Sequence, residues 1–202
     1  MKKVVLVIGL AVASMAVNAQ LYVGGSLGFS SDSETSKNAK NEKSAFTFSP
    51  EVGYYLSEKL DVGVDLSITS GQVGGQGYSE FAAAPYARYS VLQFGKFEVI
   101  GKASVGFGAF DYSKIAGGKG TKLGVNVSPI LAYGLTDNWV LFTQLNCLSL
   151  NFTATTPDGG DTYTHFGFGV DANNLVNTAE KIDVAATDPI VSGIQIGFVY
   201  KF

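Results

Sequence analysis

Six charged residues recur in segments that otherwise alternate between apolar and small residues, and they are the first candidates for chemistry. They are Glu51, Asp61, Asp65, Arg88, Glu98 and Lys102. Each shares the parity of the small residues in its segment, opposite to the apolar ones. Acids and bases in such a setting could form a catalytic cleft, line a narrow pore, or plug a lumen with ion pairs. We expect the plug, because paired charges and hydrogen bonds fill a narrow polar space at the lowest desolvation cost.

Other residues with possible chemistry lack the partners that such chemistry needs. A metal site needs clustered ligands, and the chain has one histidine, His165, and one cysteine, Cys147. The segment 158–161 (Asp-Gly-Gly-Asp) resembles part of a calcium loop without its remaining ligands or closing glutamate. The glycine-rich segment 117–121 is not followed by a helical pattern, so we do not interpret it as a phosphate cradle. We expect no metal, no cofactor and no catalytic residue.

The amino terminus has the pattern of a secretory signal peptide. Lys2 and Lys3 precede an apolar run over residues 4–17, which is too short to span a bilayer as a helix. A small-x-small motif ending at Ala19 follows, so we predict cleavage between Ala19 and Gln20 and one domain over residues 20–202. Loss of the two lysines takes the net charge from −3 to roughly −5, which argues against a nucleic-acid partner.

The rest of the chain disperses its apolar residues by alternation. Charged residues make up 15% and aromatic residues 12%, and 25 residues are glycine, but no later stretch is long and apolar enough for a membrane helix. This combination is typical of a transmembrane barrel. The segments predicted as strands are 20–30, 45–56, 60–70, 80–91, 97–112, 122–135, 139–152 and a final strand that ends at Phe202.

The connections between these segments fall into two classes. Short turns follow the second, fourth and sixth strands, and longer polar loops, such as 31–44, follow the others. Three hairpins repeat one pattern around Pro50, Pro85 and Pro129. Since each proline removes a ladder donor, we expect each one at a bulge or beside a frayed neighbour. Short turns on one side and long loops on the other are typical of an outer-membrane barrel.

Two places in the pattern are irregular. The parity of 139–152 changes after Asn146, and a bulge near Cys147 would restore the phase. The segment 162–172 alternates, but residues 173–192 intervene before the terminal strand. We interpret this as one interrupted eighth strand with the insertion near the outer surface, and ten strands are the alternative.

The size of the side chains indicates which face is outside. The small face would fit inside an eight-stranded wall, whereas the bulky apolar face would not, so a soluble barrel with an apolar core is disfavoured. A register slip of one residue would turn the six charged residues toward lipid at a cost on the order of 10 kcal/mol. Aromatic residues beside the turns predict an interfacial girdle on the periplasmic side.

The last ten residues, Gly193 to Phe202, alternate so that a strand here has one apolar face, and they end on an aromatic residue. The spacing of Gln195, Gly197, Tyr200 and Phe202 looks like the closing-strand signal of the outer-membrane barrel assembly machinery. The hairpin at 49–60 begins with a Ser-Pro pair, and the segment 84–89 (Ala-Pro-Tyr-Ala-Arg-Tyr) repeats its pattern. With these motifs and the terminal strand, the chain resembles the outer-membrane β-barrel domain family, which includes small porin-family barrels of the OmpA and OmpX kind. The resemblance covers residues 20–202 and implies an all-β, antiparallel, up-and-down transmembrane barrel. The insertion at 173–192 departs from it.

The resemblance implies location in the outer membrane, with membrane lipid and the assembly machinery as partners. We expect a monomer with a structural or surface-interaction role, in which the outer loops contact an extracellular ligand or surface. A narrow or gated channel for small solutes is the alternative. The third possibility is a lipid-modifying enzyme; such barrels pair a histidine with a nearby serine, but the residue two after His165 is Gly167.

Overall fold

The computed structural model describes residues 21–36, 39–73, 75–115, 118–146, 148–170 and 194–202. Within these ranges the chain forms ten strands and one short 3-10 helix, η1 (Ser113–Ile115), and no helix is long and apolar enough to cross a membrane. The predicted cleavage site at Ala19 and Gln20 lies outside the described residues. The strands are β1 (Leu21–Ser36), β2 (Ala39–Tyr55), β3 (Leu60–Val73), β4 (Gln76–Phe94), β5 (Phe97–Tyr112), β6 (Gly118–Gly134), β7 (Trp139–Leu145), β8 (Leu148–Pro157), β9 (Tyr163–Val170) and β10 (Ile194–Lys201).

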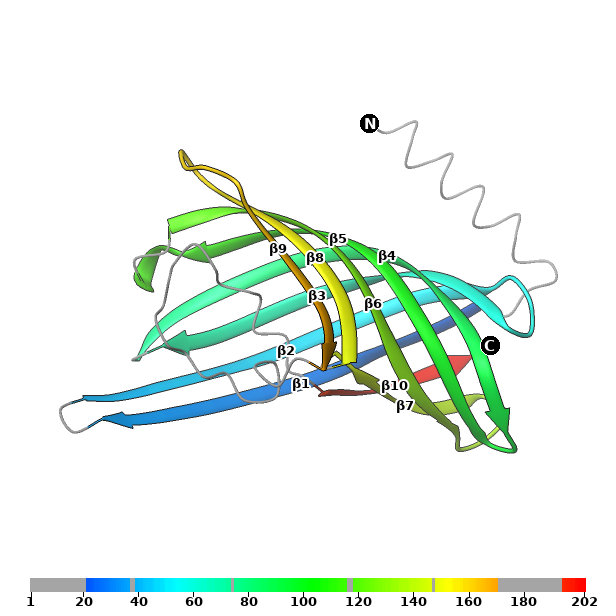
Figure 1. Cartoon of the computed structure of the whole chain (residues 1–202). Coiled ribbons are helices and arrows are strands. Elements are labelled where there is room, and N and C mark those ends of the chain that lie inside the picture. Colours follow the sequence, from blue (N-terminus) through cyan, green and yellow to red (C-terminus); the bar gives the residue numbers. More distant parts are fainter. Residues whose placement is uncertain (1–20, 37–38, 74, 116–117, 147, 171–193) are drawn as a thin grey trace.

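The strands close into a barrel (Figure 1). Each of β1 to β6 pairs antiparallel with the next, β6 pairs with β7, β7 pairs with β10, and β10 pairs with β1. This ring has eight strands at the level of the short turns, which confirms the predicted eight-stranded antiparallel barrel. Both the start of β1 and the end of β10 lie at this turn end.

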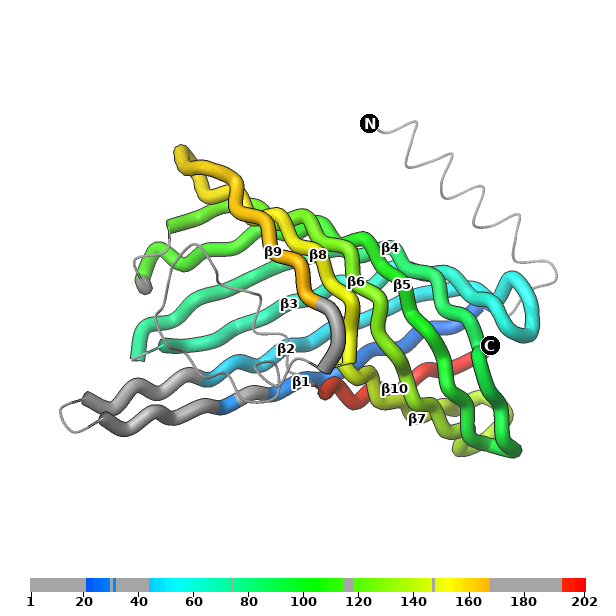
Figure 2. Tube along the Cα trace, viewed as in Figure 1, coloured from blue at the N-terminus to red at the C-terminus, as the bar shows by residue number. Residues whose placement is uncertain are grey.

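The seventh and eighth strands each consist of two pieces (Figure 2). β7 and β8 both pair with β6, while β9 continues the wall beside β8 and β10 beside β7. The interrupted eighth strand is therefore confirmed, and the insertion at 173–192 lies outside the described residues. Gln144 of β7 pairs with Ile130, and Leu150 of β8 pairs with Val127, so six residues of the seventh strand lie opposite three residues of β6. The three extra residues are an odd number, so they restore the alternation of the two faces, as predicted. The break is nevertheless wider than a one-residue bulge.

Each repeated proline lies beside a gap in one ladder, as expected. Pro50 pairs with Gly25, but the β2–β3 register skips from Phe48 to Glu51. The β4–β5 ladder also has no pair at Pro85, and the alignment of the two strands is the same on both sides of this gap. Pro129 faces the break between β7 and β8. The missing N–H of each proline therefore falls where the ladder is already open.

The predicted long loops are largely extended hairpins. β1 and β2 pair as far as Ser36 and Ala39, within the segment 31–44 that the sequence suggested was a loop. β3 and β4 pair as far as Val73 and Gln76. Strand pairing can continue without alternation in the sequence, because the backbone hydrogen bonds of the ladder do not depend on residue type.

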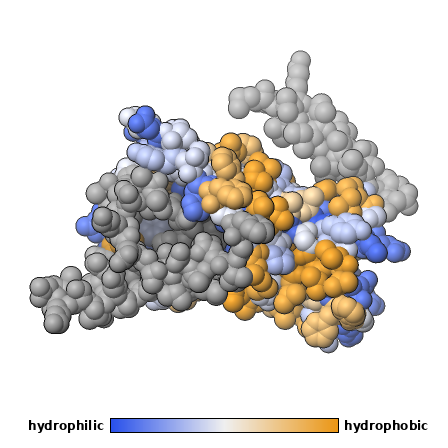
Figure 3. Space-filling model, viewed as in Figure 1, coloured by the Kyte–Doolittle hydropathy of each residue, from blue (hydrophilic) through white to orange (hydrophobic). Residues whose placement is uncertain are grey.

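The outward face carries an apolar belt, part of which is orange in Figure 3, and aromatic residues form a girdle at each edge of the belt. The girdle at the turn end, which the sequence predicted, includes Phe94, Phe97, Tyr133, Trp139, Tyr200 and Phe202. A second girdle at the hairpin end, which the sequence analysis did not identify, includes Phe29, Phe46, Phe81, Phe107, Phe152 and Phe166. From Phe97 to Phe107, β5 rises about 23 Å at ~3.3 Å per residue and ~45° tilt, close to the ~25 Å apolar band of membrane barrels.

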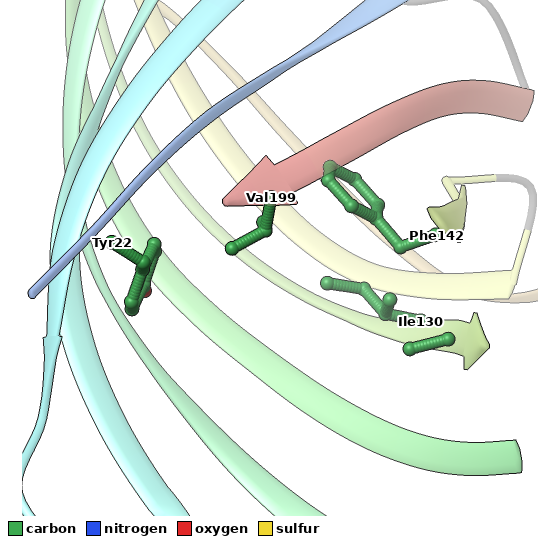
Figure 4. Close-up of a cluster of buried hydrophobic side chains, with 5 residues drawn as sticks. Tyr22, Ile130, Phe142 and Val199 are labelled. Carbon is green, nitrogen blue, oxygen red and sulfur yellow. The ribbon is translucent and has the colours of Figure 1, made fainter. Parts of the chain in front are cut away.

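Large rings that point inward lie over glycines of neighbouring strands. A Cβ at Gly53 would overlap the ring of Tyr22, and a Cβ at Gly197 would meet the ring of Phe142 at 2.5 Å. Tyr22, Phe142, Ile130 and Val199 converge in the turn-end half of the lumen (Figure 4). The lumen is thus packed at this end, and glycine provides the space for the rings.

Candidate functional site in the barrel lumen

Arg88 is the centre of an ionic layer across the lumen, which we call the septum. Its side chain is 5% exposed, and its Nη2 lies 2.9 Å from Oε2 of Glu51. Its Nε lies 3.2 Å from Oδ1 of Asp61 in an ion pair without hydrogen-bond alignment. β2, β3 and β4 supply these residues. Register explains the contact, because Asp61 pairs directly with Arg88 across the β3–β4 ladder.

Two tyrosines complete the septum. Nη2 of Arg88 donates to the hydroxyls of Tyr22, at 3.0 Å, and Tyr86, at 2.5 Å. The Tyr22 hydroxyl donates in turn to Asp61, and the two tyrosine hydroxyls are 2.9 Å apart. The guanidinium carbon lies 4.5 Å from the Tyr86 ring centroid and 5.9 Å from that of Phe142. Charge, hydrogen bonds and aromatic faces thus all fix the one buried arginine in place.

Lys102 forms a second contact just beyond the septum. Its Nζ lies 2.7 Å from Oδ2 of Asp65 and donates to Oε1 of Gln144 at 3.3 Å. The same nitrogen lies 4.5 Å from the centroid of the Tyr86 ring. Among the six residues that the sequence singled out, the structure therefore brings together Arg88 with two acids and Lys102 with a third.

A further cluster lies near the hairpin end, and the sequence analysis did not identify it. Nζ of Lys122 lies 3.1 Å from Oε1 of Glu80 and donates to the Tyr112 hydroxyl at 3.0 Å, while that hydroxyl donates to Glu80. The rings of Tyr78 and Phe110 pack against Tyr112. Glu80 and Lys122 share the parity of the small residues, which was the available signal, but 42 residues separate them in the chain.

A cavity of about 250 Å³ lies between these two ionic clusters, and we call it the chamber. Hydroxyl and amide side chains form much of its wall, including Ser26, Asn126, Gln144, Asn151 and Gln195. Small residues of β4 and β5, such as Ala84 and Gly106, leave the space open. Glu51, Asp65, Glu80, Lys102 and Lys122 bring charge to its surface.

The septum divides the chamber from a much smaller pocket at the turn end. Glu51 lines the chamber, whereas Asp61 and Arg88 line the small pocket, and the Phe142 ring borders both. Glu98, the sixth of the predicted charged residues, also lines the small pocket. The polar network therefore occupies the cross-section of the lumen between the two spaces.

The four residues of the predicted assembly signal lie on β10 or directly after it. Gln195 points inward, where its Oε1 accepts a hydrogen bond from Ser26 at 3.1 Å. Tyr200 points outward, and its ring centroid is 5.0 Å from that of Trp139 and 5.1 Å from that of Phe202. Gly197 leaves room for Phe142. Their role in assembly stays a prediction.

The remaining sequence candidates lie at the hairpin end. His165 is exposed on β9 and pairs with Thr153 in the ladder to β8. The segment 158–161 forms the exposed turn between β8 and β9, with Gly159 at a φ of 76°. Among the residues that the structure describes, no group of three or more histidine, cysteine or acidic side chains could hold a metal ion.

Comparison with known proteins gives similarity in fold only. No protein-family model matches the chain, and no curated protein matches it in sequence. Among solved structures, Neisserial surface protein A matches with a TM-score of 0.47 and 12% identity, over 91% of this chain and 96% of that one. A major outer membrane protein from Thermus thermophilus matches with a TM-score of 0.49 and 15% identity, over 92% of this chain and all of that one.

Proposed function

We propose that this protein is an integral outer-membrane barrel, exported by a cleaved signal peptide, that acts through its outer hairpins. The apolar belt between two aromatic girdles carries the proposal, since this pattern of exposure suits hydrocarbon flanked by two interfaces. The turn end would face the periplasm and the hairpin end the outside. Membrane lipid and the barrel assembly machinery are then its first partners, and the barrel acts as a monomer.

The hairpin end offers polar surface for contact with a ligand or another surface. β5 and β6 continue beyond Phe107, and Asp111 there pairs with Lys119 at 3.0 Å. Asp111 also accepts bonds from the hydroxyl and N–H of Ser113, and these contacts with Ser113, followed by Lys119, lower the pKa of this exposed carboxyl to about 2. The Asp111 carboxylate therefore stays ionised well below neutral pH, and Lys119 lies beside it on the hairpin.

Fractionation tests the location. The protein should be recovered from the outer membrane in a form that shifts on a gel after heating, as folded barrels do. Replacement of Phe202 by alanine should lower this fraction if the terminal aromatic is an assembly signal, and replacement of Phe94, an aromatic of the same girdle, serves as the control. Recovery of the native chain as dissolved periplasmic protein would contradict the proposal.

The septum supports a structural role for the lumen. Arg88 pairs with Glu51 and donates to the hydroxyls of Tyr22 and Tyr86. These groups fill the lumen on the turn-end side of the chamber. The purified barrel in a planar bilayer should therefore show no steady conductance in KCl. A stable open level in the native protein would refute the sealed lumen.

A gated channel is the second candidate, and the chamber is the observation that favours it. The space of about 250 Å³ is already present, and the septum together with Phe142 separates it from the small pocket at the turn end. Release of Arg88 from Glu51 would be the opening step. Conductance bursts that appear in Glu51→Gln but not in the native protein would support this reading.

A lipid-modifying enzyme has the least support. His165 lies exposed at the outer rim, with Gly167 two residues on. We therefore assign no catalytic residue. Mass analysis of envelope lipids from cells with and without the protein should show the same set of acyl chains, and a chain difference that depends on His165 would overturn this assignment.

A further inference from the structure

The two aromatic girdles differ in the polar atoms of their rings. At the turn end, Tyr133, Trp139 and Tyr200 bring a hydroxyl or an indole N–H to the edge of the belt. At the hairpin end, in the described part of the chain, the rings of the girdle named above are all phenylalanine, as at Phe81. Tyrosine and tryptophan suit a membrane interface because the polar atom of the ring reaches the head groups. Hydrogen bonds to head groups at the hairpin end must therefore come from other side chains.

Short hydroxyl side chains occupy this position on six strands, and we call them the hydroxyl band. Each has the outward parity and lies two residues beyond the last apolar residue of the belt or girdle on its strand. The band consists of Ser31, Ser44, Ser70, Ser79, Thr121 and Thr164, all of them exposed except Ser44, which is partly exposed. Ser31 pairs with Ser44, and Ser70 pairs with Ser79, so these hydroxyls stand side by side across their ladders.

The hydroxyl band lies at the depth of the lipid head groups. Two residues of a strand, at ~3.3 Å each and ~45° tilt, rise about 5 Å. The band is therefore about 5 Å beyond the edge of the apolar surface. The head-group layer on each side of a bilayer is about 5 to 8 Å thick, so the hydroxyls fall within it.

The outward surface at this depth offers little positive charge to an anionic head group. Among the outward strand side chains that the structure describes beyond the hairpin-end girdle, Lys119 is the one cation. Its Nζ lies 3.0 Å from Oδ2 of Asp111, so an anionic lipid would have to compete with this carboxylate. Recognition of phosphate groups and of anionic membrane surfaces relies on clusters of lysine and arginine. A head group without charge therefore fits the band better.

We propose that the hairpin end of the belt binds lipids with uncharged sugar head groups, whose hydroxyls exchange hydrogen bonds with the hydroxyl band. A serine or threonine hydroxyl both donates and accepts, as a sugar hydroxyl does, so the two surfaces can bond in either direction. The turn end differs, because its turns carry exposed charged residues, namely Glu58, Lys59, Lys96 and Asp137. The proposal rests on the outer-membrane location proposed above and names the class of lipid on the outer side.

Two tryptophan reporters, one at each end of the belt, test the proposal. Trp139 is the single tryptophan of the sequence and reports from the turn end, and Phe81→Trp combined with Trp139→Phe moves the reporter to the hairpin end. Each barrel is reconstituted in phosphatidylcholine vesicles with one lipid whose brominated acyl chains quench a tryptophan in contact with them. The brominated lipids are digalactosyl diacylglycerol, phosphatidylglycerol and phosphatidylcholine. Both leaflets have the same composition, so a difference between the two reporters comes from the protein.

The reporter at position 81 should select the sugar lipid over phosphatidylcholine at least about threefold, as one or two net hydrogen bonds would give. It should not select phosphatidylglycerol, and the reporter at position 139 should not select the sugar lipid. Equal quenching by the three lipids at position 81, selection of phosphatidylglycerol there, or an equal sugar preference at both reporters would overturn the proposal. Absence of quenching by every lipid at both reporters would contradict the membrane location itself, and the head-group assignment with it.

Two double variants of the barrel with the reporter at position 81 make the matched comparison. Ser70→Ala with Ser79→Ala removes two hydroxyls beside the reporter, because Ser70 pairs with Ser79 and Ile68 pairs with Phe81. This variant should lose the preference for the sugar lipid. Ser67→Ala with Ser104→Ala is the control, because both of these hydroxyls face the chamber, and it should keep the preference. Equal loss in the two variants would assign the effect to the barrel as a whole and refute the band.

Discussion

Replacement of Arg88 by methionine tests the septum most sharply. Methionine keeps the unbranched stem of the arginine side chain and removes the guanidinium group with its charge. Glu51 and Asp61, which are 8% and 7% exposed, then keep their burial without the cation that lies 2.9 and 3.2 Å from them. Removal of one partner from a buried ion pair costs about 3 to 5 kcal/mol, and we expect the upper end because two carboxylates lose the same partner.

Unfolding of the barrel in urea, followed by gel mobility, measures this loss. With a slope of about 2 kcal/mol per molar urea, a loss of about 5 kcal/mol moves the midpoint down by about 2.5 M. Lys119→Met serves as the control because Lys119 pairs with Asp111 on the exposed hairpin, where an ion pair contributes little.

A triple variant separates charge from packing. Arg88→Met combined with Glu51→Gln and Asp61→Asn removes the uncompensated charges and should recover more than half of the lost stability. If the free energy of unfolding of Arg88→Met lies within about 1 kcal/mol of that of the native protein, the septum is solvated and the reasoning fails. Failure of the triple variant to recover would instead assign the loss to the shape of the side chain.

Three further results are expected. Gly53→Val should lower the unfolding free energy by about 1 to 3 kcal/mol, because the added side chain overlaps the Tyr22 ring. Leu66→Lys, on the outward face of β3, should cost about 2 to 4 kcal/mol in a lipid bilayer by the same urea assay. The carboxyl of Asp111 should titrate near pH 2 by NMR; because its pKa is lowered, its contribution is present above about pH 4, the unfolded value, and is lost as the pH falls through about 2.

Each of these has a matched contrast. Gly106→Ala should be tolerated, since Ala84 is the only neighbour of the new Cβ within 4 Å. Gln72→Lys lies on the same outward parity of β3 but beyond the apolar belt, so its cost should be about 0 to 1 kcal/mol. Ser113→Ala should raise the Asp111 pKa, because the Ser113 hydroxyl donates to that carboxyl. Equal costs for Leu66→Lys and Gln72→Lys would contradict the belt.

The sequence predicted the wall of the barrel well because alternation and turns determine it. A period of two assigns each residue to a face, so the inward position of Glu51 and Arg88 and the outward position of Leu66 follow directly. The phase change after Asn146 predicted the break between β7 and β8 for the same reason. Both features are local in the chain.

The sequence did not predict the partners inside the lumen, because these depend on register and on the shear of the barrel. Parity places Glu80 and Lys122 inside but not opposite each other, and the closure of the ring brings them to 3.1 Å. Tyr22 shares parity with the small residues, and the space over Gly53 that admits its ring becomes visible only in three dimensions. The sequence predicts loops where the structure has hairpins because the residues there do not alternate, and backbone pairing alone leaves no pattern in the residue types.

The central claim is that the apolar face contacts hydrocarbon and the small and charged face lines the lumen. Nitroxide labels on single cysteines at Leu66, which is outward, and Ser67, which is inward, test it in a barrel that carries Cys147→Ser and is reconstituted in lipid vesicles. We predict that the label at position 66 is open to oxygen and shielded from a water-soluble nickel chelate, and that the label at 67 is less open to oxygen. Greater access of the nickel chelate than of oxygen at position 66 would contradict the account.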